Sequence, residues 1–322
     1  MKILKSILFD IMFWIYFGGC VSYLTNDKID MLAVLSVGIL VAISSNVLGV
    51  SVGRKIFNPC RNSKLFSKIS NWLIALILLL TIIVGWNLVE VNPYKFFTKF
   101  KNTSGILKGL FNPNLKILEI SIAALAETIY LALLATVFAI PFAFVFSFFA
   151  ARNLMPKSIF GNIIYFLTRT VSTIFRSIEA IVWAIIFSVW VGIGPFAGML
   201  ALMVHSVAAL TKLYSEQIEN IDEGQIEAIK ATGASTLQIW IYAVIPQVLS
   251  PFLAFTIYRW DINVRMATIV GFVGGGGIGL LLLQQQQMLR WHNVGLIMWL
   301  IALVVWIMDM VSAKVREKLR DI

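Results

Sequence analysis

Long apolar stretches recur along this chain and constrain its fold more than any other feature of the sequence. Of its 322 residues, 59% are hydrophobic and 13% are charged, whereas a typical soluble domain is about 25% charged. A helix needs about 20 mostly apolar residues to cross the hydrocarbon core of a bilayer. Eight stretches approach or exceed this length: 7–24, 31–50, 72–91, 120–150, 178–193, 196–213, 248–273 and 294–311.

These stretches predict membrane-spanning helices. Backbone N–H and C=O groups find no water in lipid, so a spanning segment must be a helix or a strand of a closed barrel. The alternation of apolar and polar residues that marks barrel strands is absent from the sequence. We therefore expect an all-α, polytopic membrane protein with about eight transmembrane helices.

The net charge of +10 has two explanations. A basic chain can bind nucleic acid, but in a chain this apolar, lysine and arginine concentrate in cytoplasmic loops. A cytoplasmic N-terminus places most basic residues inside, including Arg152, Arg169 and Arg176 in the connection before 178 and those of the tail 313–322. We therefore expect a protein of the cytoplasmic membrane with both termini in the cytoplasm and no nucleic-acid partner.

The lysine-rich segment 92–117 is the exception, because this orientation places it outside. We expect an amphipathic helix at the membrane surface here, with its apolar residues facing lipid. Those residues are Phe96, Phe97, Phe100, Leu107, Leu110 and Phe111.

Motifs of catalysis and metal binding are missing from the sequence. The two cysteines, Cys20 and Cys60, form no CxxC pair, which predicts neither a metal site nor a disulfide framework. No GxxxxGKS or GxxxxGKT loop occurs, so ATP hydrolysis is expected on another chain. HExxH and GxSxG motifs are also absent, and the chain is not expected to be an enzyme or to bind a cofactor itself.

A polar, helix-forming segment lies between the sixth and seventh apolar stretches. Asp222 is a preferred N-cap residue, and Gly233 accepts the left-handed conformation that often ends a helix. Ser235 and Gln238 have the spacing of a second capping box. We expect Pro246 to stop the second helix before the next span, because proline donates no backbone hydrogen bond. The segment predicts a helix–turn–helix elbow across the inner membrane face.

The residue order in this elbow is specific. Glu227 and Ala228 are followed by Gly233 and then by Pro246. This spacing resembles the EAA loop of ABC import permeases, with which the membrane subunit docks on its ATPase, although Ile229 stands where that loop usually has alanine. An ordinary amphipathic connector between two spans is the alternative interpretation.

Further motifs resemble permeases of the phosphonate type. The resemblance covers roughly 118–312, whereas 1–117 is much less diagnostic. It rests on AARNL (150–154), GPFAG (194–198), HS (205–206), KLYSE (212–216), ID (221–222), YRWDINVR (258–265) and GFVGGGGIG (271–279).

This resemblance implies the methionine-type permease fold and an importer of phosphonate-like anions. The implied partners are a second permease copy, two ATPase subunits that bind ATP and Mg²⁺, and an extracytoplasmic substrate-binding protein. We divide the chain into N-terminal helices with a basic amphipathic outer loop (1–117), a permease core (118–312) with a cytoplasmic docking loop (214–246), and a basic tail (313–322). The residues expected to dock the ATPase are Asp222, Glu227, Ala228, Gly233, Ala234 and Pro246.

Charged residues within the seventh stretch are candidates for an anion pathway. Arg259, Asp261 and Arg265 are costly in lipid, so they are expected to face the interior of a helix bundle. Asp261 and Arg265 can neutralise each other at i,i+4, which leaves Arg259 with Asn263 one turn above it. An arginine fork matches the oxygens of a phosphonate. An ion-pair network that holds the core helices together explains the same residues.

Gly274, Gly275, Gly276 and Gly277 are candidates for an outer gate. The run 274–279 formally matches GxGxxG, but no strand precedes it, so it does not predict a dinucleotide site. We expect a tight outer turn or re-entrant piece, whose backbone amides could contact a passing anion. Close packing alone explains these glycines equally well.

Two other functions fit the sequence. The ligand of the same kind of transporter could be phosphite, phosphate or methionine, since the sequence does not rank the phosphorus oxyanions. Alternatively, Asp261, Glu179 or Glu127 could carry protons in an ion-coupled secondary transporter, which would need no ATPase.

Overall fold

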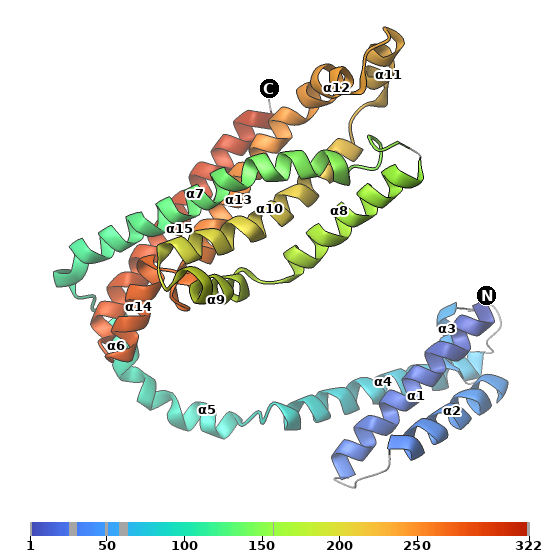
Figure 1. Ribbon diagram of the computed structural model, residues 1–322. Helices are drawn as coiled ribbons and strands as arrows, with labels where there is room; N and C mark the ends of the chain where they lie inside the picture. Colours follow the sequence, from blue (N-terminus) through green and yellow to red (C-terminus); the bar gives the residue numbers. More distant parts are fainter. Residues whose placement is uncertain (1, 26–30, 49–50, 58–63, 157, 321–322) are drawn as a thin grey trace. The chain divides into compact units, whose positions relative to one another are not determined.

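The computed structural model describes residues 2–25, 31–48, 51–57, 64–156 and 158–320, and every regular element in these ranges is helical (Figure 1). The chain forms two compact units, Met1–Lys101 and Asn102–Ile322. Cys20 is buried, whereas Cys60 lies outside the described residues.

The first unit is built around two paired helices, α1 and α2. Asp10 of α1 is buried and accepts hydrogen bonds from the amide of Gly53 at 2.8 Å and from the hydroxyl of Ser51. Tyr16 donates a hydrogen bond to Thr81 at 3.0 Å and so links α1 to α4. The helices of this unit are α1 (Lys2–Thr25), α2 (Met31–Leu48), α3 (Val52–Phe57), α4 (Lys64–Leu88) and α5 (Pro93–Lys99).

The second unit holds the longest helices of the chain, and the 3₁₀ segment η2 (Phe100–Thr103) leads into it. Shorter helices connect the long helices along the chain. The elements are α6 (Ser104–Phe111), η3 (Leu115–Ile117), α7 (Leu118–Ala150), α8 (Ile159–Ser177), α9 (Ala180–Val191), α10 (Pro195–Glu219), α11 (Glu223–Ala231), α12 (Thr236–Ile239), the π-helical segment η4 (Trp240–Val244), α13 (Ile245–Gly271), α14 (Gly277–Gln287) and α15 (Trp291–Arg320).

Six helical segments in the described part of the chain are long and apolar enough to cross a membrane. A bend of 88° separates α8 from α9, and the two helices pass the same test only together, as a broken span or a re-entrant loop. The expected span 31–50 corresponds to α2, whose apolar part, Val34–Ser45, is shorter. The all-α, polytopic architecture is thus confirmed. The six segments are Lys5–Leu24, Asn71–Leu88, Leu115–Ala150, Pro195–Glu219, Thr236–Gly271 and Trp291–Leu319.

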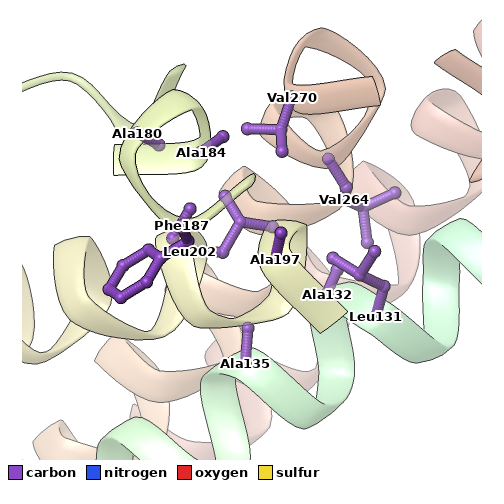
Figure 2. Close-up of a cluster of buried hydrophobic side chains, with 12 residues drawn as sticks. Leu131, Ala132, Ala135, Ala180, Ala184, Phe187, Ala197, Leu202, Val264 and Val270 are labelled. Atoms are coloured by element: carbon purple, nitrogen blue, oxygen red, sulfur yellow. The ribbon is translucent and has the colours of Figure 1, made fainter. Parts of the chain in front are cut away.

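Small side chains dominate the core of the second unit. In Figure 2, Ala132 and Ala135 of α7 and Ala197 of α10 lie in one cluster with Val264 and other residues of α9, α10 and α13. These three alanines are fully buried. Such residues let helices approach closely in lipid, where packing rather than the hydrophobic effect drives association.

A second core cluster lies near the C-terminal ends of α7 and α10. Tyr214 of α10 stacks on Phe252 of α13 with ring centroids 3.9 Å apart, and the two rings are nearly parallel. Phe148 of α7 contacts Trp240 of η4 at 5.1 Å between centroids. This cluster packs the three central helices against the base of the α11–α12 segment.

The segment 92–117 is largely helical, but only part of it is free to face lipid. Phe96, Phe97 and Phe111 are each at least two thirds exposed. Helix α6 instead packs on α15, because Trp299 donates a hydrogen bond to the carbonyl of Leu110 at 2.9 Å. Leu107 and Leu110, expected to face lipid, are only partly exposed.

Candidate functional site

The α11–α12 segment forms the elbow that the sequence predicts. Asp222 caps α11, and its side-chain oxygen accepts a hydrogen bond from the amide of Gly224 at 2.9 Å. At the other end, Gly233 adopts a left-handed φ of 79° and donates its amide hydrogen to the carbonyl of Lys230. Both helix boundaries are therefore confirmed. We call residues 222–239 the docking elbow.

The second arm of the elbow differs from our expectation. The predicted capping box is present, with the amide of Ser235 donating to the side chain of Gln238 at 2.8 Å. Pro246 does not stop the helix: α12 continues through η4 directly into α13, and Pro246 lies in the first turn of α13. Pro246 directly follows the π turn, where the regular i→i−4 hydrogen-bond pattern is already interrupted, so the missing amide hydrogen is tolerated there.

The docking elbow offers an open surface to a partner. No residue of α11 is buried, although α10 and α13 on either side are core helices. Glu227 and Ala228 are exposed, Ala234 is half-buried, and Leu237 is 63% exposed. Polar and apolar groups are thus available together on a short protruding helix pair (Figure 1).

The four candidates for an anion pathway separate into two groups. Asp261 is buried and accepts a hydrogen bond from Arg265 at 2.6 Å. Arg265 also lies 3.8 Å from Asp309 of α15. This group holds α13 to α15, as the structural interpretation of the pair predicts.

Arg259 and Asn263 form the other group, together with hydroxyl groups from two further helices. The Nε of Arg259 donates to Ser206 of α10 at 3.0 Å. The side-chain amide of Asn263 donates to Ser206 at 2.8 Å and to Thr136 of α7 at 2.9 Å. These four polar residues are buried at the centre of α7, α10 and α13.

The charge of Arg259 has no anionic hydrogen-bond partner among the described residues. Its side chain is 6% exposed, and its Nη2 is buried without a hydrogen-bond acceptor. A buried cation is costly unless it is paired. Thr136 is not predicted from the sequence, because a threonine in an apolar helix carries no signal until its neighbours are known.

The glycine turn between α13 and α14 is tightly packed. Gly274, Gly276 and Gly277 have φ angles of 92°, 77° and 66°, a region that glycine adopts without steric cost. A Cβ on Gly198 of α10 would lie 2.5 Å from the carbonyl oxygen of Gly275. The turn therefore lies directly against the start of α10.

Four amides of this turn already have acceptors: those of Gly274, Gly275, Gly277 and Ile278. Gly277 donates to Glu127 at 3.3 Å, and Ile278 donates to Thr128 at 2.8 Å, both on α7. Gly274 and Gly275 donate to carbonyls of α13. Packing thus accounts for the glycines in this conformation, and a role as an outer gate stays a prediction.

Comparison with known proteins identifies a common architecture. A model of the family described as "Binding-protein-dependent transport system inner membrane component" matches residues 143–316. The phosphite transport system permease protein PtxC of Stutzerimonas stutzeri is 35% identical over 196 residues, which cover 61% of this chain and 70% of that protein.

A longer match covers most of this chain but only half of its relative. The phosphate-import permease protein PhnE of Mycolicibacterium smegmatis is 28% identical over 89% of this chain and 54% of its own length. Among solved structures, a chain of the inward-facing MetNI methionine ABC transporter superposes with a TM-score of 0.54 at 22% identity, covering 64% of this chain and 99% of that one. The expected methionine-type fold is thereby confirmed.

Proposed function

Because this chain belongs to the family of binding-protein-dependent transport system inner membrane components, we propose that it is the permease subunit of an ABC importer of phosphonate-like anions. The importer acts in the cytoplasmic membrane. Its other parts are a second permease copy, two ATPase subunits that bind ATP and Mg²⁺, and an extracytoplasmic substrate-binding protein. Relatives named for phosphite and phosphate, both phosphorus oxyanions, support this substrate class.

The exposed docking elbow is the observation that carries the proposal. A short helix with no buried residue projects between two helices of the core. Such a helix can insert into a groove on a partner, as amphipathic helices commonly do. When the ATPases close on ATP, they displace the elbow, and α10 and α13 follow because they continue the same chain. The helical core then exchanges outward for inward access.

The substrate class agrees with the charge distribution in the core. Arg259 supplies a positive charge that no described carboxylate satisfies by a hydrogen bond. A guanidinium binds the oxygens of a phosphonate or phosphite through two parallel N–H donors. Asp261 and Arg265 neutralise each other and so add little net charge to the pathway.

A proton-coupled carrier is less well supported. It needs a carboxylate that is free to bind and release a proton in the membrane. Two of the three candidates have partners, because Glu127 accepts a hydrogen bond from the glycine turn and Asp261 is paired with Arg265. The third, Glu179, is exposed at the start of α9. Methionine is an alternative ligand for the same class of transporter. Direct titration of the partner binding protein with phosphonate, phosphite, phosphate and methionine distinguishes these ligands.

The docking proposal is tested with Glu227→Lys and Gly233→Val in proteoliposomes that contain the complete importer. We expect both variants to lose ATPase co-purification and ATP-driven uptake. The first reverses a charge on the exposed face, and the second places a β-branched residue at a φ of 79°. Glu317→Lys, the same charge change on the exposed end of α15, is the matched control.

Unchanged co-purification and uptake in both elbow variants would remove the docking proposal. Uptake that persists without ATP and stops with an uncoupler would instead favour an ion-coupled carrier.

A further inference from the structure

Glu219, the last residue of α10, ties the root of the docking elbow to the α7–α8 connection. Its Oε1 accepts a hydrogen bond from the amide of Arg152 at 2.9 Å and one from Nη1 of Arg169 in α8 at 2.8 Å. The side chain of Asn153 donates to the carbonyl of Ile218 at 2.7 Å. Three contacts therefore connect the end of α10 to a different part of the helical core.

The same root is attached to α13 on its other side. The side chain of Gln247 accepts a hydrogen bond from the amide of Asp222 at 3.0 Å. Its amide group donates to the carbonyl of Ala243 at 2.8 Å. The short connection 219–222 is thus held between α8 and α13, directly before the elbow begins.

The Arg169–Glu219 contact lies at the edge of an open polar pocket. A polar cavity of about 870 Å³ separates α8 from the start of α11. The side chains of Arg169 and Glu219 are 36% and 25% exposed. An ion pair that water reaches contributes little to stability, so its removal is expected to leave the fold intact. Residues around the cavity include Arg152, Asn162, Tyr165, Arg169, Glu219 and Glu223.

A second arginine keeps this contact in place. The guanidinium groups of Arg152 and Arg169 both lie over the ring of Tyr165, at 5.2 and 5.5 Å from its centroid. Arg152 also donates to Asn162 at 2.8 Å. The aromatic ring and the amide hold the two guanidinium groups on one side of Glu219, which fixes the direction of the ion pair.

We propose that Glu219 is a positioning residue that passes the movement of the docking elbow to α8 through Arg169. The inference rests on the proposed function, because it requires an ATPase that moves the elbow. Helices α10 and α13 follow the elbow through the backbone, whereas α8 has no such continuity and is joined to the root of the elbow by these side-chain contacts in addition to its packing on α10. Glu219 therefore couples ATP hydrolysis to transport without touching substrate or nucleotide.

The test compares Glu219→Gln with Glu216→Gln in the complete importer in proteoliposomes. Glu216 lies on the same helix, one turn earlier, in an exposed pair with Lys212 at 3.5 Å. Substrate imported per ATP hydrolysed is the readout, together with ATPase co-purification. We expect Glu219→Gln to retain the ATPase and hydrolyse ATP, but to import at least about fivefold less substrate per ATP, the lower end of coupling between sites.

Two further variants separate positioning from folding. Arg169→Gln should give the same loss as Glu219→Gln, and Arg169→Lys, which keeps the charge, should retain part of the import per ATP. Glu216→Gln should match the wild-type complex. The inference would be overturned if Glu219→Gln imported as much substrate per ATP as Glu216→Gln. An equal fall of ATP hydrolysis and of substrate import in Glu219→Gln would overturn it as well.

Failure of the proposed function gives a different result. In that case the wild-type chain itself would neither retain an ATPase nor show ATP-driven import. A wild-type complex that transports, combined with a fully coupled Glu219→Gln variant, rejects the role of Glu219 alone.

Discussion

Two arginines on one helix illustrate how the surroundings of a residue decide its role. Arg265 faces Asp261 one turn away and has Asp309 at 3.8 Å, so its charge is balanced within the chain. Arg259 donates a hydrogen bond to the hydroxyl of Ser206 through Nε, and its Nη2 has no acceptor among the described residues. The guanidinium of Arg259 thus has no hydrogen-bonded carboxylate in the described part of the chain, and its role in an anion pathway stays a prediction.

Replacing Arg259 with glutamine is expected to lower import of the anion by about 10- to 100-fold, since a hydrogen bond to a charged group contributes roughly 1.5–3 kcal/mol. The measurement is ATP-driven uptake by the complete importer, normalised to the amount of permease in the membrane. Arg290→Gln, the same change at an exposed position, is the control and should import normally. Wild-type import by Arg259→Gln would assign this arginine a purely structural role.

The sequence predicts part of this arrangement. The i,i+4 spacing of Asp261 and Arg265 identifies their pairing, because a helix places them on one face. The same spacing leaves Arg259 with Asn263, but it does not bring these two residues to Ser206 and Thr136, which are 53 and 127 residues away from their partners in the polar cluster. Such contacts arise only when three helices pack together.

At the scale of elements, the glycine turn determines how closely α10 approaches the junction of α13 and α14. Gly198 lies one turn into α10, and the nearest atom to its missing side chain is a backbone oxygen of Gly275. Backbone cannot move aside as the end of a flexible side chain can. The position of α10 therefore depends on a glycine on each side of this contact.

Gly198→Ala is accordingly expected to destabilise the protein by about 1–3 kcal/mol, the usual cost of overpacking. The measurement is the thermal unfolding temperature of the purified protein in detergent. Gly105→Ala is the control, because no atom outside its own helix lies within 4 Å of a Cβ at that position. Equal unfolding temperatures for the two variants would contradict the close approach of α10 to the turn.

Elements differ in how well the sequence predicts them. The caps at Asp222, Gly233 and Ser235 are local, and all three form as expected. Helix α8 escapes prediction because its arginines and polar residues interrupt the apolar run that marks a span. The predicted helix stop at Pro246 is wrong, because the sequence around a proline does not show whether a helix ends there or continues.

At the scale of the molecule, the match to the family model is confined to one of the two compact units. The family model matches 143–316, which lies entirely within the second unit. Both core clusters and the docking elbow belong to that unit as well. Orientation, in contrast, is a property of the whole chain, because each span reverses the side on which the next connection lies.

The orientation predicts that α5 and α11 lie on opposite sides of the membrane. Single cysteines at Tyr94 and Gln225, both exposed, introduced into a chain without its natural cysteines, test this. A membrane-impermeant thiol reagent added to intact cells should label position 94 at once and position 225 only after permeabilisation. Labelling of position 225 from outside would place the docking elbow on the wrong side and remove its proposed role.

The π-helical segment η4 has a geometric consequence for the elbow that it joins to α13. A π turn contains one residue more than an α-helical turn, and each α-helical residue advances about 100° around the axis. Here the amide of Ile245 bonds to the carbonyl of Trp240, five residues back. The azimuth of α12 about the axis of α13 is thus set by a single surplus residue. Regular α-helical winding of all five residues 240–244 would turn the elbow away from its present direction by about 100°, whereas deleting one of them would restore regular winding and leave the elbow close to its present direction.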